Sequence, residues 1–205
     1  MKKKAIDLFP ESFLKAYKKT MVHEGGYANI PEDKGGETYM GIARNSHPDW
    51  EGWHFIDEQK ALHGSIPHNR KYSELELPVR SFYHTVFWSK WHTVIANQSQ
   101  IIAEYLFDEG VNCGKIIAGR HLQRALNILN NNGALWSEIT VDGFIGSNTY
   151  KAFDSCIARK RDRVLLNALI VLRGYYYIRI MEKRPTQEVF AYNWLTRLVA
   201  DVVPK

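Results

Sequence analysis

The sequence predicts a mostly α-helical protein with one short β excursion after its first long helix. Three observations support this fold class. Apolar residues recur at helical spacing through most of the chain. One glycine-rich stretch, "MVHEGGYANIPEDKGGETYMGI" (21–42), interrupts that pattern. No repeat or low-complexity linker divides the 205 residues, so we expect residues 1–205 to form a single compact unit.

The first helix is expected over residues 11–24, where Phe13, Tyr17 and Met21 recur every four residues. The two glycines that follow are typical of a helix end. Glu24 comes three residues after Met21, so it falls on the apolar stripe and is expected to point inward. That is an unusual place for a carboxylate.

The glycine-rich segment 27–42 is expected to form a short hairpin or an irregular loop. Residues 43–77 are loop-rich, with a short helix at 56–62. Helices then dominate, and the plausible module boundary lies near Ala96–Ser99. The remaining helices are expected at 78–92, 99–114, 115–130, 146–160, 163–181 and 187–200. The three tyrosines Tyr175–Tyr177 are too many for one buried face, so at least one should reach a surface or groove.

Composition excludes a disordered chain, because 45% of the residues are apolar and 13% are aromatic. The net charge of +5 and the pI of about 9.1 suit an anionic partner such as nucleic acid, a membrane surface or bacterial cell wall, or serve solubility alone. No run of five like charges is present, so we expect no nucleic-acid partner.

The start of the chain, "MKKKAIDLFPESFLKAYKKT", has charged residues but no apolar region after them, so we expect synthesis in the bacterial cytoplasm without a standard signal peptide. The most apolar run, residues 164–172, is too short to span a bilayer, and no stable membrane insertion is expected. Cys113 and Cys156 are expected to be buried thiols rather than a disulfide.

Glu24 and Asp33 form a pair of carboxylates nine residues apart across a glycine turn, which suits glycoside hydrolysis. Burial should raise the pKa of Glu24 and make it an acid, whereas Asp33, in a polar loop, should stay charged. The alternative reading is that Glu24 decorates a helix end and that Asp33 belongs to an ordinary turn.

The stretch "HEGGYANIPEDKGGETYMGI" resembles the signature of glycoside hydrolase family 108, which has E-G-G-Y, then D-x-G-G-x-T, then G-I. The resemblance implies a lysozyme-like all-α fold. It also implies the activity of a bacterial or phage lysozyme (N-acetylmuramidase), which is an endolysin-like activity. Some members of the family were described as secretion activators. Glu24 would be the catalytic acid and Tyr27 a substrate-binding residue. The order of residues is also similar to that of bacteriophage lysozymes. By that analogy Asp33 and Thr38 would lie on the face of the substrate opposite Glu24 and hold the water, although Thr38 falls one residue earlier than the threonine of those lysozymes.

The stretch "FYHTVFWSKWHTV" (82–94) resembles a later helix of the same family, except that His92 replaces the acid usual after the second tryptophan. Trp88 and Trp91 either stack on sugar rings or pack in the core. Trp91 is the candidate for substrate binding.

The C-terminal half resembles the predicted peptidoglycan domain that accompanies this family, which gives modules at 10–95 and 98–200. Asp108 and Asn112, four residues apart in "FDEGVNCG", either line a cleft or are hydrogen-bonded internally, and both are candidates for substrate binding. The segment "LQRALN…ITVDGFIGSNTYKAF" is similar to small peptidoglycan-binding modules. There we expect structural roles for Asp142–Gly143 and Thr149.

The combined expectation is a muramidase that hydrolyses the β-1,4 bond between N-acetylmuramic acid and N-acetylglucosamine and acts on the cell wall, in the periplasm or outside the cell. A lytic transglycosylase and a non-catalytic wall-binding or secretion-assisting protein are the alternatives. The partners of this protein would be peptidoglycan glycan strands, and we expect it to be a monomer. There is no H-E-x-x-H, no paired cysteine motif and no phosphate loop, so no metal or cofactor is expected.

Overall fold

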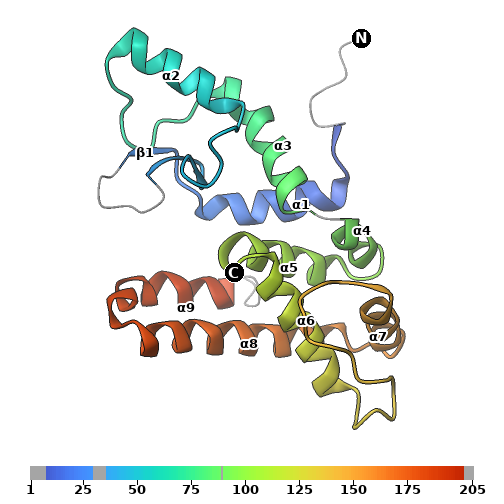
Figure 1. Cartoon of the computed structure of the whole chain (residues 1–205). Coiled ribbons are helices and arrows are strands. Elements are labelled where there is room, and N and C mark those ends of the chain that lie inside the picture. Colours follow the sequence, from blue (N-terminus) through green and yellow to red (C-terminus); the bar gives the residue numbers. More distant parts are fainter. Residues whose placement is uncertain (1–7, 30–35, 89, 201–205) are drawn as a thin grey trace. The chain divides into compact units, whose positions relative to one another are not determined.

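A computed structural model describes residues 8–29, 36–88 and 90–200 (Figure 1). These residues contain nine α-helices and one small three-stranded sheet, so the predicted mostly α fold with a β excursion is confirmed. The chain divides into two compact units, Met1–Ser89 and Lys90–Lys205, which are described separately below. The division falls a few residues before the Ala96–Ser99 boundary expected from the sequence. A single body over residues 1–205 stays a prediction.

The first unit begins with helix α1 (Glu11–Thr20), which continues as a 3₁₀ turn η2 (Met21–His23). Together they cover nearly the whole predicted helix 11–24. Phe13 is fully buried, and its ring lies 5.5 Å from Tyr17 and 5.7 Å from Trp88 between centroids. This aromatic packing fixes α1 against the rest of the unit.

The glycine-rich segment forms the predicted hairpin, as part of an antiparallel sheet with strand order β1-β2-β3. Its strands are β1 (Tyr27–Asn29), β2 (Glu37–Tyr39) and β3 (Ile42–Ala43). Met40 and Gly41 alone connect β2 to β3, with Tyr39 paired to Ile42. Met40 and Gly41 have positive φ angles, 46° and 78°, which is the pattern of the tight two-residue hairpin turn.

Two longer helices complete the first unit: α2 (Gly52–His63), which is longer than the predicted 56–62, and α3 (Glu76–Val86), preceded by the 3₁₀ turn η3 (Ser73–Leu75). The single helix predicted over 78–92 is wrong. After Val86 the backbone N–H groups of Phe87 and Trp88 both donate to the Tyr83 carbonyl at 3.0 Å, and the regular ladder ends. Trp88 is buried at 5% exposure, so tertiary packing overrides the local helical pattern here.

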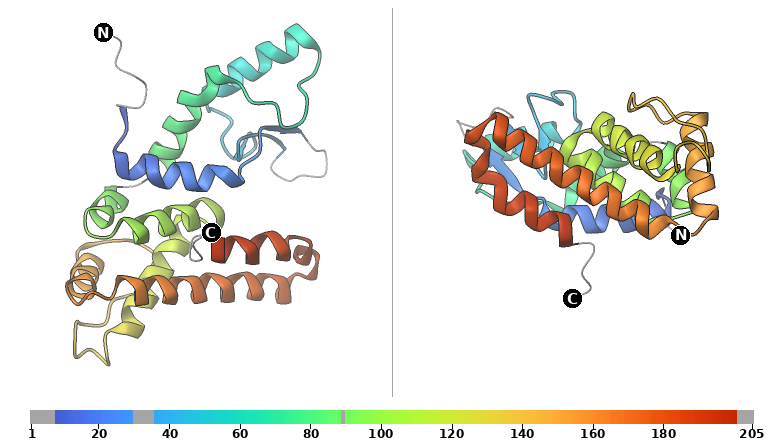
Figure 2. Two further views of the ribbon diagram at one scale, coloured as in Figure 1. Left: turned by 180° about the vertical axis from the view of Figure 1, so that it is seen from behind. Right: turned by 90° about the horizontal axis from the view of Figure 1, so that it is seen from below.

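The regular elements of the second unit are all helices among its described residues, and an irregular loop at 130–146 joins α6 to α7. They are α4 (Lys90–Ala96), α5 (Gln100–Cys113), α6 (Lys115–Leu129), α7 (Ser147–Ala158), α8 (Asp162–Lys183), the 3₁₀ helix η4 (Pro185–Phe190) and α9 (Ala191–Ala200). Helices α5, α6 and α8 pack on one another, and η4 turns the chain so that α9 runs back along α8. Figure 2 shows the pairing of α8 and α9 from two further sides.

Helix α8 is the one helix among the described residues that is long and apolar enough to cross a membrane, judged by length and composition alone. The core helix of a compact protein passes the same test. In this unit α8 buries Leu165, Leu169 and Leu172 and packs on α5, α6, α7 and α9. The expectation of no membrane insertion stays a prediction.

The turn between α6 and α7 brings together the residues that were expected to be structural. Gln123 donates to the Asp142 carboxylate at 2.8 Å and accepts from the Gly143 N–H at 2.7 Å. Gly143 has a φ of 90°, and a side chain at Gly119 would meet the Gly143 carbonyl oxygen at 2.3 Å. Gln123 also lies 3.5 Å from the Thr149 hydroxyl. One glutamine thus fixes the loop that leads into α7.

Candidate active site

Glu24 lies just after the η2 turn, where the backbone becomes extended, and its residue is partly buried. Its carboxyl group packs over the β2–β3 turn. A Cβ atom built on Gly41 would lie 2.6 Å from Glu24 Oε2 and 2.6 Å from the Tyr83 hydroxyl oxygen. Tyr83 is buried at 1% exposure, and its hydroxyl donates to the Met40 carbonyl at 2.8 Å. The Glu24 carboxyl group and the Tyr83 hydroxyl therefore both lie against a turn that only glycine fits.

The two glycines after Glu24 let another segment approach closely. A side chain at Gly26 would come within 2.4 Å of the Asn69 carbonyl oxygen. Residues 69–70 bind to the start of β1 through Tyr27 N–H to Arg70 O at 2.9 Å and Asn69 N–H to Tyr27 O at 2.7 Å. These bonds fix the path by which the chain leaves Glu24.

Tyr27 is held inside the first unit by a carboxylate. It is 5% exposed, and its hydroxyl donates to Glu37 Oε1 at 2.7 Å. Burial and the adjacent Glu37 raise the pKa of Tyr27 to about 12, so the phenol stays protonated at neutral pH. Glu37 also pairs with Lys60 at 2.9 Å and with Arg44 at 3.0 Å. A role for Tyr27 in substrate binding stays a prediction.

Thr38 and Asp33 are the other two residues predicted for this region. Thr38 is partly buried in β2, and its hydroxyl lies 3.5 Å from the Ala28 carbonyl on β1. Asp33 lies outside the described residues. The proposed roles of Asp33 and Thr38 on the face opposite Glu24 stay predictions.

The two tryptophans of the 82–94 stretch lie in different units. Trp88 packs in the core of the first unit, as described above. Trp91 belongs to α4 of the second unit, is partly buried and stacks on His92 with 3.6 Å between ring centroids. Asp108 and Asn112 also belong to the second unit. These three candidates therefore belong to a different compact unit from Glu24, and their substrate-binding roles stay predictions.

Asp108 forms the centre of a buried ion network in the second unit. Its carboxylate is reached by Arg173 Nη1 at 2.8 Å and Arg197 Nη2 at 2.6 Å. Burial acts to raise the pKa of Asp108, but the two guanidinium groups outweigh burial and hold the pKa below its usual value. Asn112 is exposed and donates to the Asp108 carbonyl at 2.9 Å. These contacts match the internally hydrogen-bonded alternative.

Both cysteines are free thiols, as expected from the sequence. Burial is the main cause that raises the pKa of Cys113 and of Cys156 to about 11, so both stay protonated at neutral pH. Within the described residues, no group of three His, Cys, Asp or Glu side chains is placed to hold a metal ion.

Sequence reasoning missed several residues that shape the two regions. Tyr83 and Asn69 are far from Glu24 along the chain. Tyr83 lies in the family-like stretch 82–94, but nothing in that stretch linked it to Glu24, and no motif includes Asn69. Glu37 occupies a variable position of the D-x-G-G-x-T pattern, so the motif gave no reason to single it out. Glu109, fully buried and 2.6 Å from His121 Nδ1, was also not singled out.

Comparison with known proteins matches two families to successive parts of the sequence, with the boundary between residues 114 and 117. The family model for Glycosyl hydrolase 108 matches residues 17–114, and that for "Predicted Peptidoglycan domain" matches residues 117–199. A solved structure of Brucella abortus SagA is similar, with a TM-score of 0.57 and 21% sequence identity, over 93% of this chain and 91% of that chain. That likeness shows a shared fold. No curated protein matches the chain.

These matches confirm the resemblance seen in the sequence: residues 17–114 belong to the glycosyl hydrolase 108 family, and residues 117–199 form the predicted peptidoglycan domain that follows.

Proposed function

We propose that the protein is a muramidase that hydrolyses the β-1,4 bond between N-acetylmuramic acid and N-acetylglucosamine, with Glu24 as the general acid. The observation that carries the proposal is the position of Glu24 inside the glycosyl hydrolase 108 region, where it is partly buried and its carboxyl group lies against Gly41, as the Tyr83 hydroxyl does. A carboxyl group partly removed from water suits the delivery of a proton to a leaving oxygen.

In this proposal the Tyr83 hydroxyl is a positioning group, because it is tied to the Met40 carbonyl on the turn beneath the carboxyl group. Asp33 would be the second carboxylate, which either positions a water molecule or stabilises the cationic transition state. The substrate would be glycan strands of the cell wall, in the periplasm or outside the cell.

The deciding experiment compares wild type with Glu24→Gln on purified peptidoglycan, followed by turbidity loss and by release of reducing ends. Removal of a general acid lowers the rate by roughly 10²–10⁴-fold, so clearing should nearly stop. Glu11→Gln is the matched control, because Glu11 lies on α1 of the same unit with 81% of its side chain exposed. Equal activity of wild type and Glu24→Gln would rule out this assignment.

Mass spectrometry of the products separates hydrolysis from the transglycosylase alternative. A muramidase releases muropeptides with reducing ends, whereas a lytic transglycosylase releases anhydro products. On the hydrolase proposal Asp33→Asn should also lose most of its activity, because the second carboxylate acts on water or on the developing cation. Wild type that binds sacculi but releases no fragments would favour the non-catalytic alternative.

A further inference from the structure

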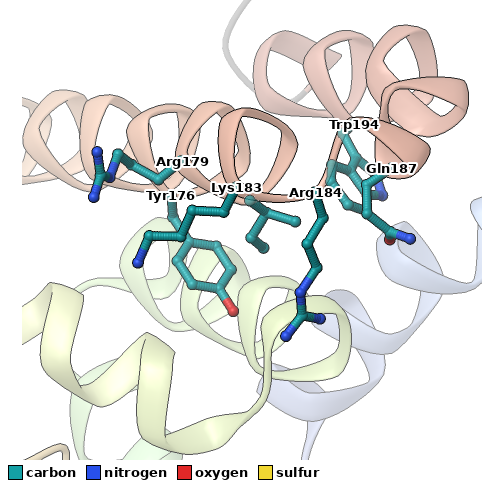
Figure 3. A pocket seen from close by; sticks show the side chains of 7 residues that line it. Tyr176, Arg179, Lys183, Arg184, Gln187 and Trp194 are labelled. Carbon is teal, nitrogen blue, oxygen red and sulfur yellow. The ribbon is translucent and has the colours of Figure 1, made fainter.

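The second unit has a cationic pocket of about 460 Å³ that lies outside the glycosyl hydrolase 108 region. Its lining comes from the last turns of α8, from η4 and from α9, all within the predicted peptidoglycan domain. Figure 3 shows the side chains that matter: Tyr176, Arg179, Lys183, Arg184, Gln187 and Trp194. The volume is in the range of pockets that hold small ligands.

The pocket carries a concentrated positive charge. Arg179, Lys183 and Arg184 are all exposed and follow one another along the end of α8. Among the described residues, the ion contact found for these three cations is a long one of 3.6 Å from Arg179 to Glu182. Guanidinium groups recognise carboxylates with two parallel hydrogen bonds, so this lining suits a carboxylate-bearing ligand.

One wall of the pocket is aromatic and is fixed by the core. The Trp194 ring stacks on Tyr177 with 5.0 Å between centroids, and Tyr177 accepts a hydrogen bond from Arg173 Nε at 2.8 Å. The Arg197–Asp108 ion pair ties the same helix α9 to α5. Trp194 is therefore already in place before any ligand arrives, which lowers the cost of binding.

The expectation for the three consecutive tyrosines is confirmed here. Tyr177 is buried at 3% exposure, Tyr175 is 52% exposed and Tyr176 lines the pocket. In the view of Figure 3 the Tyr176 ring lies among the ends of Lys183 and Arg184. Aromatic faces beside cations suit a ligand that has a sugar or aliphatic part next to a carboxylate.

We propose that this pocket binds the stem peptide of peptidoglycan, with its free carboxylates on Lys183 and Arg184 and its adjoining apolar part against Trp194 and Tyr176. The inference rests on the proposed function, because that function makes peptidoglycan the substrate. The N-acetylated sugars of the glycan are neutral and their lactyl group is joined to the peptide, so the negative charges of this polymer lie on the stem. In this proposal the pocket binds the peptide and the Glu24 region binds the glycan.

The test measures binding without cleavage, using the full chain with Glu24→Gln and a soluble disaccharide tetrapeptide in isothermal titration calorimetry. Adding Lys183→Gln and Arg184→Gln should weaken binding about tenfold, as expected for the loss of hydrogen bonds to a charged group. The matched control adds Arg124→Gln and Arg163→Gln, which remove two exposed cations of the same unit outside the pocket. This control should change binding by less than about twofold. Thermal melting checks that each variant is folded.

Changes to the ligand give a second, independent arm. The same muropeptide with its carboxylates amidated should bind about tenfold more weakly, and the pocket substitutions should then cause no further loss, because both changes remove one interaction. Glycan strands stripped of peptide should bind equally to the pocket variant and to its control. Equal binding of the free-acid muropeptide to both variants, or no effect of amidation, would overturn the proposal.

Two further outcomes are separated in the same design. If inorganic polyphosphate displaces the muropeptide at equal concentration, the pocket is a general anion site and its assignment to the stem peptide is wrong. Release of reducing ends by wild type is measured separately. A protein that binds stem peptides but cleaves no glycan would refute the muramidase proposal and leave the pocket assignment standing.

Discussion

Two constraints act at position 41, and only glycine satisfies both. Its φ angle of 78° lies in the left-handed region, and any Cβ would collide with the Glu24 carboxyl group and the Tyr83 hydroxyl. The G-I element of the family motif thus has a physical reason in this chain. The glycine leaves room for the proposed acid on top of a hairpin turn.

Gly41→Ala should therefore reduce activity more than stability. We expect a loss of about 1–2 kcal/mol in the free energy of unfolding from the backbone strain, and a much larger loss in hydrolysis because Glu24 is displaced. Gly64→Ala is the matched control: Gly64 has a φ of 77°, but a Cβ there has nothing within 4 Å. Urea unfolding and reducing-end release are measured on both. Equal activity of the two variants would contradict the role given to Gly41.

At the scale of elements, Glu37 joins the sheet to helix α2. Its carboxylate, whose side chain is 9% exposed, pairs with Lys60 of α2 and with Arg44 just after β3, and it accepts from Tyr27 of β1. Asp57 of α2 bridges the same two cations, each at 2.9 Å. The β excursion is too small to be stable alone, so such contacts hold it in place.

Glu37→Gln should loosen this attachment. The amide keeps an acceptor for Tyr27 but loses its charge, so we expect the free energy of unfolding to fall by about 1–3 kcal/mol. Glu58→Gln, an exposed change on α2, should cost much less. Denaturant unfolding of both variants at pH 7 is the measurement. Equal midpoints would show that the Glu37 network adds nothing to stability.

Local patterns predicted most elements but not their partners. The spacing of Phe13, Tyr17 and Met21 indicated α1, and the glycines indicated the hairpin. The break after Val86 was missed, because burial of Trp88 is a tertiary effect that no local pattern carries. Asp108 was recognised as a polar group on an apolar face, but its partners Arg173 and Arg197 lie 65 and 89 residues away. Pattern reasoning within one helix cannot find such partners.

The Asp108 network should make the second unit sensitive to acid. Asp108→Asn leaves two guanidinium groups near an uncharged amide in a buried site, and we expect a loss of about 3–5 kcal/mol at pH 7. Asp154→Asn is the matched control, because Asp154 is an exposed residue of α7 and its carboxylate accepts from Gln98 Nε2, which the amide oxygen of Asn can also do. Thermal and urea unfolding of both variants at pH 7 measure the difference.

The pH dependence has a definite sign. The pKa of Asp108 is lowered in the folded protein, so the unfolded chain takes up the proton first as the pH falls. The stabilisation by ionised Asp108 is present above the pKa of the unfolded carboxyl group, about 3.9, and is lost as the pH drops through the lowered folded pKa. As the pH falls from 5 through the lowered folded pKa of Asp108, the free energy of unfolding should therefore fall more for wild type than for Asp108→Asn. Parallel pH curves for the two proteins would contradict this.

At the scale of the whole chain, the family boundary and the packing boundary do not coincide. The glycosyl hydrolase 108 match ends at residue 114, after α5, whereas the second compact unit begins at Lys90, the first residue of α4. Helices α4 and α5 therefore belong by sequence to the first family and by packing to the second unit. Helix α5 buries Ile102, Leu106 and Phe107, and it packs against α4, α6 and α8.

This mismatch predicts an unusual result for truncated chains. A chain ending at residue 114 keeps α5 but loses α6, α8 and the arginines that pair with Asp108, so it should expose an apolar face and a buried carboxylate. A shorter chain ending at Ser89 keeps a unit with its own core and should stay more soluble. Light scattering, binding of a hydrophobic dye and thermal melting compare the two. A soluble 1–114 chain that melts cooperatively, beside an aggregating 1–89 chain, would mean that the family boundary and not the packing boundary defines the folding unit.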